Sequence, residues 1–429
     1  MFLILLMLLQ TMKPVSEKFI LLFMPKPNRD GRRMPPLALL AISTWLEREK
    51  FDIHIFHSND KEEYLEALDY LDQVICVGIS AMTGYQVEDG LAFANLVRKR
   101  NKDVPIIWGG IHPTIKPIQT AEHPLVDIVV KCPGEDTFTE LVYCLTEDKP
   151  LADVLGIVYK KDGRIIENQD RPIKPMSDYP PLPYHLLDDK IDRYIKKNEF
   201  AERSLAYISS SGCPFRCAFC YLGTPSFQRK WDYYSAERVV DEIEFITKKY
   251  SLDGVDIRDS NFFVDIERVK KICRGLIDRN IKIVITNLNG RSDQLAGCSD
   301  ADWELFKNSG IRQLLIGAES GDQKMLDLIN KQNQVENTLK CEIKARQHGI
   351  NIINSFMTSF PPATDNVRER NQALKSELNS SVELIRRIFD VNPVADILLF
   401  FLRRIRGQFF LISRSRGDLL FLKNLKTGA

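Results

Sequence analysis

Residues 209–221 read SSSGCPFRCAFCY and place three cysteines, Cys213, Cys217 and Cys220, within eight positions. The chain has nine cysteines in 429 residues, so this C-x3-C-x2-C spacing is improbable by chance. Three thiolates at this spacing can bind three irons of a cubane [4Fe-4S] cluster and leave the fourth iron open. The amino and carboxylate groups of S-adenosylmethionine (SAM) can chelate such an iron. The array therefore predicts an iron-sulfur site that follows the strand-like LAYISSS (205–211).

Two other kinds of site use clustered cysteines. A structural zinc site needs four closed ligands, and the next cysteine is Cys273, on a predicted helix. A thioredoxin-like redox site uses a CxxC pair, but a third cysteine in a barrel-like context does not match its surroundings. We expect the iron-sulfur cluster.

The composition indicates a globular chain of two or three domains, with 44% hydrophobic and 27% charged residues. A net charge of +1 gives no global field that would attract nucleic acid, so we expect no nucleic-acid partner. The remaining six cysteines are scattered, unlike a secreted disulfide framework, which favours a reducing, cytoplasmic location.

The first 17 residues form an apolar N-terminal extension. Its apolar run from Phe2 to Leu9 lacks a basic region and a small-residue cleavage site, and it is too short to span a bilayer. A signal peptide and a membrane-surface anchor are alternatives. The simplest interpretation is an upstream extension with Met12 as the functional start, and we expect no transmembrane segment.

Residues 18–150 alternate apolar runs with amphipathic stretches. The runs at 18–25, 51–58, 73–80, 104–110 and 126–132 are rich in Val, Ile and Leu without strict alternation. This pattern predicts a doubly wound, Rossmann-like parallel sheet with helices between its strands. Ligands of such sheets bind at the carboxyl ends of the strands, where the stretches SAMTG (80–84), GGIHPT (109–114) and CPGED (132–136) lie. Turn glycines without a ligand are the alternative.

Residues 151–200 mark a boundary between domains. Lys161, Asp162 and Gly163 lie between two short strand-like runs and predict a hairpin. Prolines at 172, 175, 180, 181 and 183 then indicate a linker.

Residues 201–402 repeat a strand and helix unit. We expect strands at 205–211, 254–260, 282–288, 312–320, 350–360 and 395–402. Six such units predict a partial (β/α)6 barrel whose ligands bind at the carboxyl ends of the strands, where the cysteine array lies.

Two groups of motifs resemble the radical SAM enzymes of the branch that carries a cobalamin (B12)-binding domain. The first group is MPPLALLAIS (34–43), VGISAMTGYQ (77–86), WGGIHPT (108–114) and VDIVVKCPGED (126–136). The second is the cysteine array with IRDSNFFVD (257–265), NGRSDQL (289–295) and IGAESGDQKMLDLINK (316–331). The resemblance implies a cobalamin-binding domain before a radical SAM barrel, with a [4Fe-4S] cluster, SAM and cobalamin as cofactors.

The resemblance also implies cobalamin contacts in the first domain, from Ser80, Thr83, Gly109, Gly110, His112, Thr114 and Glu135. His112 would line the corrin without binding the metal. Asp52, Ile53 and His54 begin the Asp-x-His-x-x-Gly pattern that puts a histidine on cobalt, but His57 stands where the glycine should be. We therefore assign His54 no ligand role.

In the barrel, the resemblance implies that Phe219 lies beside the adenine of SAM. Glu319 would contact the methionyl amine or the ribose, Arg291 would approach the carboxylate, and Asp259 would face the cavity. The alternatives are an ion pair for Arg291, a buried hydrogen-bonded acid for Glu319 and a helix cap for Asp259.

The chain departs from the family pattern in two places. Members usually have Gly-x-Pro-Gly-Glu-Thr after the fifth strand, where this chain has SFPPAT (359–364). A Pro-Gly-Thr loop is expected after the sixth strand, but residues 403–429 form an atypical basic tail, which is either truncated or a genuine short ending.

Three functions remain open at this point. The enzyme either uses cobalamin to methylate an unactivated centre, or performs a non-methylating radical reaction such as cyclisation or oxidation, or is a non-catalytic relative. The first two cleave SAM to a 5′-deoxyadenosyl radical. We expect a small-molecule or lipid-like substrate and an external electron donor of the flavodoxin or ferredoxin type.

Overall fold

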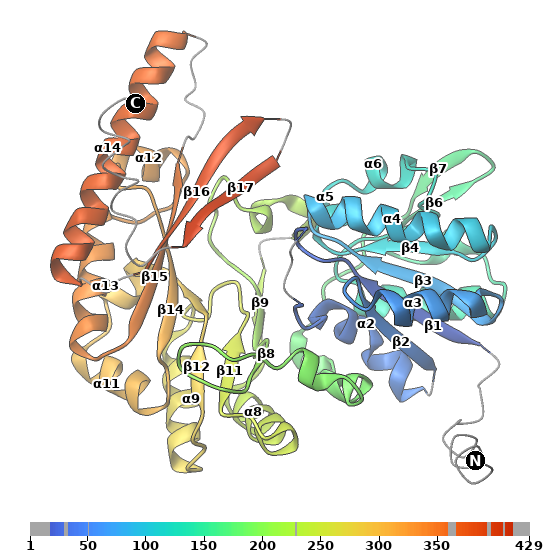
Figure 1. Ribbon diagram of the computed structural model, residues 1–429, viewed down its shortest axis with the longest axis horizontal. Helices are drawn as coiled ribbons and strands as arrows, with labels where there is room; N and C mark the ends of the chain where they lie inside the picture. The colour runs from blue at the N-terminus through green and yellow to red at the C-terminus, as the bar shows by residue number, and fades with distance from the viewer. Residues whose placement is uncertain are drawn as a thin grey trace. The chain divides into compact units, whose positions relative to one another are not determined.

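The computed structural model describes residues 18–29, 33–49, 51–227, 230–358, 366–392, 396–405 and 408–414. The expectations for residues 1–17 and for SFPPAT (359–364) lie outside these ranges. The chain forms two compact units (Figure 1). The first runs to residue 174 and includes 178–194, and the second contains 175–177 and the chain from 195 onward.

The first unit is built on a seven-stranded sheet of order β2-β1-β3-β4-β5-β6-β7. Its first five strands are parallel, in an order that places β1 and β3 at the point where the winding reverses. The expected doubly wound sheet is therefore confirmed. These strands are β1 (Phe19–Met24), β2 (Asp52–His57), β3 (Val74–Ser80), β4 (Ile106–Gly109) and β5 (Ile128–Val130).

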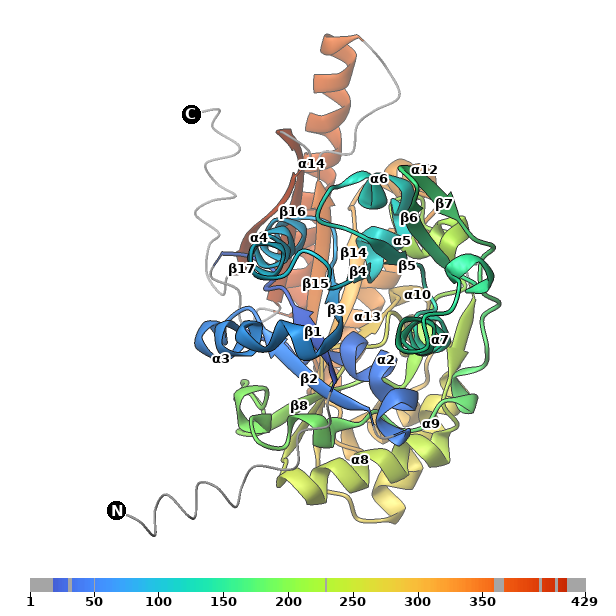
Figure 2. The same ribbon diagram turned by 90° about the vertical axis from the view of Figure 1, so that its right-hand side faces the viewer.

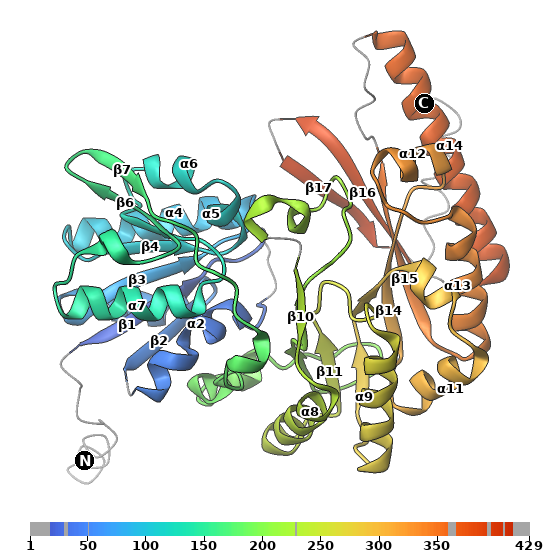
Figure 3. The same cartoon turned by 180° about the vertical axis from the view of Figure 1, so that it is seen from behind.

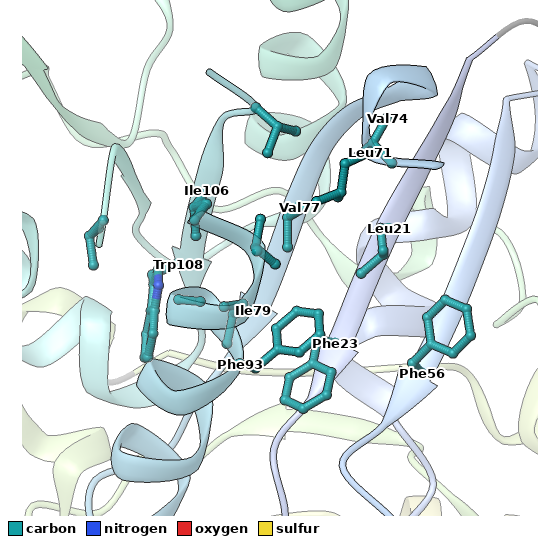
Figure 4. Close-up of a cluster of buried hydrophobic side chains, with 14 of the residues drawn as sticks. Leu21, Phe23, Phe56, Leu71, Val74, Val77, Ile79, Phe93, Ile106 and Trp108 are labelled. Carbon is teal, nitrogen blue, oxygen red and sulfur yellow. The ribbon is translucent and has the colours of Figure 1, made fainter. Parts of the chain in front are cut away.

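Helices cover both faces of this sheet (Figure 2). One face carries α2 (Leu37–Arg48) and α7 (Glu135–Thr146), and the other carries α3 (Lys61–Ala67) and α4 (Tyr85–Arg100). Under α3 and α4, the ring of Phe23 stacks on Phe93 with centroids 3.7 Å apart (Figure 4). Tyr64 meets both rings edge-on. Covering both faces buries most side chains of the inner strands, which explains the apolar sequences of β1, β3 and β5.

The predicted hairpin is present, but it belongs to the sheet. Strands β6 (Ile157–Lys161) and β7 (Arg164–Glu167) are antiparallel, and β6 pairs with β5. The turn residues Asp162 and Gly163 have φ values of 51° and 73°, as a tight two-residue hairpin requires. We expected residues 151–200 to form a hairpin and a Pro-rich linker; residues 151–174 and 178–194 group with the first unit.

The second unit contains the six expected parallel strand positions. They are β8 (Ser204–Tyr207), β11 (Gly254–Ile257), β12 (Val284–Thr286) continued by β13 (Leu288–Gly290), β14 (Gln313–Glu319), β15 (Asn351–Thr358) and β16 (Asp396–Ile405). They pair as two sheets, β12-β11-β8 and β13-β14-β15-β16-β17, because the third strand is interrupted at Asn287, whose φ is 58°. The partial (β/α)6 barrel is confirmed.

The helices of this unit lie along the outer side of its strands (Figure 3). They include α8 (Ala236–Tyr250), α9 (Ile266–Asp278), α11 (Asp300–Asn308), α13 (Val335–Gln347) and α14 (Val367–Val391). Ser235 and Asp265 cap α8 and α9, and Ser299 forms a capping box with Asp302 at α11. Such caps fix where each helix begins, and therefore the length of each loop that precedes it.

Part of the basic tail also forms a strand. We expected only an atypical basic tail after residue 402, but β17 (Gln408–Arg414) pairs antiparallel with β16. The apolar run QFFLIS, at 408–413, was the sequence signal for it. Within the described residues, no helix has the length and apolar composition needed to cross a membrane.

Candidate active site

The cysteine array occupies the loop after β9 (Ser210–Gly212), at the carboxyl end of the first barrel strand. Strand β9 pairs antiparallel with β10 (Trp231–Tyr233). Gly212 has a φ of 77°, and a Cβ there would lie 1.8 Å from the Lys230 carbonyl oxygen, so only glycine can enter the loop in this conformation. The three cysteines that follow are free and partly buried.

Asp259 fixes the start of this loop. Its carboxylate is fully buried, and it accepts hydrogen bonds from the Ser209 amide at 2.7 Å and from the hydroxyls of Ser209 and Ser210, each at 2.6 Å. Burial raises the pKa of Asp259, and the serine donors oppose that rise. The alternative of a helix cap does not apply, because Asp265 caps α9. Contact between Asp259 and a cofactor stays a prediction.

Arg291 follows β13 and is 4% exposed. Its guanidinium pairs with Asp293 at 3.0 and 3.1 Å and donates to the carbonyl oxygens of Lys331 and Gln332 at 2.6 and 3.0 Å. It also donates from Nη1 to Cys217 Sγ at 3.8 Å and stacks 3.8 Å above the Phe215 ring. The ion pair that we considered as an alternative is therefore present, and the same side chain contacts the cysteine loop.

Glu319 lies at the last position of β14 and pairs with Lys331, with Oε1 and Nζ 2.7 Å apart. Both side chains are buried. Glu319 has a φ of 62°, a strained conformation that concentrates at functional sites. A Cβ at Gly317 would lie 2.3 Å from Glu319 Oε1 and 2.8 Å from Lys331 Nζ, so the glycine leaves the room that this ion pair occupies.

Sequence reasoning missed Lys331 and the residues beside it as part of the site. The amide of Ala218 donates to the Ile329 carbonyl at 2.8 Å, and the Asn330 side chain donates to the Arg216 carbonyl at 2.9 Å. The segment after α12 (Gln323–Leu328) thus holds the cysteine loop in place. The motif LINK (328–331) is part of the resemblance to radical SAM enzymes, but we expected no role for its residues.

The environment of the thiols is partly buried and flanked by cations. Burial raises the pKa of Cys213 and Cys220, while the charge of Lys331 opposes the rise at both and Arg291 opposes it at Cys213. Iron binding removes these protons, and the two cations favour the resulting thiolates. In the part of the chain described, no three His, Cys, Asp or Glu side chains converge on a single-ion site. A cubane takes each thiolate on a different iron, so three free cysteines on one loop fit a [4Fe-4S] cluster.

Phe219 lies between the second and third cysteines and is 40% exposed. Its ring centroid is 6.0 Å from Lys331 Nζ. The ring therefore lies near the Glu319–Lys331 pair. A residue that contacts the adenine of SAM would need to lie near this pair, and the contact of Phe219 with the adenine stays a prediction.

The first unit brings its predicted residues together at the carboxyl ends of β3, β4 and β5. The amide of Ala81 donates to the Gly109 carbonyl at 2.9 Å, and the His112 amide donates to the Ala81 carbonyl at 3.0 Å. Gly110 has a φ of 93°, and a Cβ there would lie 2.9 Å from Ser80 Oγ. The two loops after β3 and β4 are thus in backbone contact, which a side chain at 110 would disrupt.

Hydroxyl and imidazole groups extend this edge. Thr83 Oγ1 lies 3.1 Å from His112 Nδ1. Thr114 donates to the Gly110 carbonyl at 2.7 Å and accepts from the Cys132 amide at 3.1 Å, which joins the loop after β5 to the other two. Burial lowers the pKa of His112, with help from Lys116, so the ring is neutral at neutral pH. Burial raises the pKa of Glu135, at the start of α7.

These loops fit a large flat ligand such as a corrin. Gly84 begins α4 with a φ of 108° and has nothing within 4 Å of an added Cβ, so this edge offers an open backbone surface lined by hydroxyls. His54 lies elsewhere, within the edge strand β2, with Nε2 3.2 Å from Asp52 Oδ2 and its ring 4.7 Å from Phe19. That His54 has no ligand role stays a prediction.

Comparison with known proteins gives matches for both units. The model of the B12 binding domain matches residues 29–142, and that of the Radical SAM superfamily matches residues 207–371. The uncharacterized methyltransferase PH0819 of Pyrococcus horikoshii is 28% identical over 365 residues, which cover 82% of this chain and 76% of that protein. The anaerobic magnesium-protoporphyrin IX monomethyl ester cyclase of Synechocystis is 26% identical over 385 residues, 87% of this chain and 74% of its own.

A solved structure has the same fold over most of the chain. The radical SAM methyltransferase TsrM of Kitasatospora setae, with cobalamin and a [4Fe-4S] cluster bound, superposes with a TM-score of 0.68 at 17% identity. The match covers 89% of this chain and 72% of that one. At this identity the likeness concerns the fold.

Proposed function

Because the chain belongs to the radical SAM superfamily, in the branch with a B12 binding domain, we propose that it methylates an unactivated carbon or phosphorus centre. The relative from Pyrococcus horikoshii, which matches this chain over most of its length, is named as a methyltransferase. The observation that carries the proposal is that the Cys213, Cys217 and Cys220 loop lies beside the buried Glu319–Lys331 ion pair, in a chain whose first unit also has the loops that would hold cobalamin.

Cys213, Cys217 and Cys220 would hold the [4Fe-4S] cluster, and the loops after β3, β4 and β5 would hold cobalamin. When bound, the reduced cluster supplies the electron that cleaves SAM to methionine and a 5′-deoxyadenosyl radical, and cobalamin supplies a methyl carrier. The protein has to position the cofactors and keep water away from them.

Glu319 and Lys331 are suited to the methionyl end of SAM, which carries one amino group and one carboxylate. The amine could donate an N–H to Glu319 and the carboxylate could accept from Lys331, so SAM would replace the contact that the two side chains make with each other. We expected Arg291 in the carboxylate role. Each nitrogen of its guanidinium already has a partner, so we assign that role to Lys331.

In the first unit, Ser80, Thr83, Thr114 and His112 would line the corrin, with the neutral His112 ring bonded to Thr83. Gly109 and Gly110 would let the backbone approach it closely. Glu135, partly buried at the start of α7, would complete this edge.

The substrate would be a small or lipid-like molecule, and the electron would come from a donor of the flavodoxin or ferredoxin type. An open-iron cluster is destroyed by oxidants, which favours a reducing, cytoplasmic setting.

The products of SAM distinguish methylation from other radical reactions. The anaerobically reconstituted protein, loaded with iron, sulfide and cobalamin, is reduced and mixed with SAM, and S-adenosylhomocysteine and 5′-deoxyadenosine are quantified. Methyl transfer from SAM leaves S-adenosylhomocysteine, so the proposal predicts both products, with S-adenosylhomocysteine only when cobalamin is present. Formation of 5′-deoxyadenosine alone would favour a non-methylating reaction, as the name of the cyclase relative suggests. Formation of neither would favour a non-catalytic relative.

A further inference from the structure

Arg291 makes an unusual set of contacts for a residue that was expected to bind substrate. Its side chain is 4% exposed and contacts three separate segments. These are its own loop through Asp293, the segment after α12 through the carbonyls of Lys331 and Gln332, and the cysteine loop through Phe215 and Cys217. A group with these partners is held in one orientation.

The contact with Cys217 has an electrostatic consequence. The guanidinium is a positively charged donor, and it donates an N–H toward the sulfur at 3.8 Å. Hydrogen bonds and positive charge at ligand sulfurs stabilise the more negative, reduced state of an iron-sulfur cluster. Asp293, at 3.0 Å from Arg291 Nε, partly offsets that charge.

We propose that Arg291 is a positioning residue of the cluster, which orients Cys217 and raises the reduction potential of the iron that Cys217 binds. This inference rests on the proposed function insofar as the three cysteines bind a cluster. It differs from a role in SAM binding, because the effect on the potential exists before SAM is added. One electron from a chemical reductant such as dithionite, or from a flavodoxin-type donor, enters the cluster more readily when the guanidinium is in place.

The two members of the Arg291–Asp293 pair should shift the potential in opposite directions. Arg291→Gln removes the positive charge beside Cys217. The ratio of reduced to oxidised cluster at a fixed solution potential should therefore fall about tenfold, which corresponds to a decrease in the reduction potential of about 59 mV for one electron. In Asp293→Asn the charge of Arg291 is less compensated, so the ratio should rise. Loss of a merely structural contact would not give shifts of opposite sign.

The test is an anaerobic redox titration of the reconstituted, SAM-free protein, followed by electron paramagnetic resonance of the reduced cluster, with iron quantified for every sample. Arg312→Gln is the control, because Arg312 is a partly buried arginine that donates to backbone carbonyls, those of Lys307 and Ile311, at the other end of β14. It should leave the potential unchanged. Arg291→Lys keeps the charge without the planar donor set and should fall between Arg291→Gln and the wild type.

Each outcome is decisive for the inference. Equal potentials in the wild type, Arg291→Gln and Asp293→Asn, at full iron content, would overturn it. If Arg291→Gln does not retain iron, the test rests on Asp293→Asn. A cluster reduction potential in that variant equal to or below that of the wild type would overturn the inference. Failure of the wild type to bind about four irons per chain would instead contradict the cluster itself.

Discussion

Glu319 Oε1 lies 2.7 Å from Lys331 Nζ, and both side chains are buried at the carboxyl end of β14. A buried ion pair is costly to break from one side, because the remaining charge is left without compensation. The pair lies over Gly317 and close to Phe219, within the region that holds the cysteine loop. Single and double mutations of this pair should therefore separate its contribution to the free energy of unfolding from its contribution to SAM binding.

Removing one member of this pair should destabilise the protein, and removing both should not. We expect Glu319→Gln and Lys331→Met each to lower the free energy of unfolding by about 3–5 kcal/mol, and the double variant to recover most of that loss. All three should fail to form 5′-deoxyadenosine from SAM. Urea unfolding of the unreconstituted protein gives the stabilities. A double variant that still cleaves SAM would contradict the assignment of Glu319 and Lys331 to the methionyl end.

Asp259 should be needed for the cluster although it binds no iron. In Asp259→Ala, the Ser209 amide and two serine hydroxyls lose their buried acceptor, at a cost of about 3 kcal/mol or more, and iron per chain should fall. Asp265→Ala removes only the α9 cap, at about 1 kcal/mol, and should bind iron like the wild type. Equal iron contents in the two variants would show that Asp259 does not support the cysteine loop.

Gly110→Ala should impair cobalamin binding and spare the cluster. The added Cβ would lie within 2.9 Å of Ser80 Oγ and 3.0 Å of the Ala81 backbone, in a loop whose φ of 93° already disfavours alanine. Gly163→Ala is the control, because its φ is 73° but an added Cβ there meets nothing within 4 Å. Absorbance after gel filtration with added cobalamin measures the binding. Retention of cobalamin by Gly110→Ala at the wild-type level would place the ligand elsewhere.

His112 should make stability depend on pH in the acid range. Its pKa is lowered from 6.5 in the folded protein, so the unfolded chain takes up the proton first as pH falls. The stability that the neutral ring contributes is present above pH 6.5 and is lost as pH falls below it through the folded pKa. The drop in Tm between about pH 7.5 and about pH 5.5 should be smaller in His112→Gln. The same drop in the wild type and in His112→Gln would contradict the prediction.

The sequence predicted the two folds well because each rests on a strong local signal. Unbroken Val, Ile and Leu runs indicate strands buried on both faces, and the structure has a strand at every one of them. The hairpin turn at Asp162 and Gly163 was also correct, but its pairing with β5 depends on contacts distant in sequence, which no local pattern reports. For the same reason the pairing of β17 with β16 was missed.

The site was predicted in part for a similar reason. The cysteine array is readable because its three ligands are adjacent in the chain. Lys331 contacts Glu319, 12 residues away, and Arg291 contacts Cys217, 74 residues away. The sequence does not distinguish a charged loop residue that is solvated from one that is buried. Only the fold shows that the guanidinium nitrogens of Arg291 are already engaged.

The most direct test of the central claim is the formation of 5′-deoxyadenosine by the anaerobically reconstituted, reduced protein with SAM, beside a Cys217→Ala control. The account predicts that the wild type forms 5′-deoxyadenosine and that the control, which lacks one of three cluster ligands, does not. Equal amounts from both proteins would contradict the assignment of the cysteines. No 5′-deoxyadenosine from a wild type that holds about four irons per chain would contradict the radical SAM activity itself.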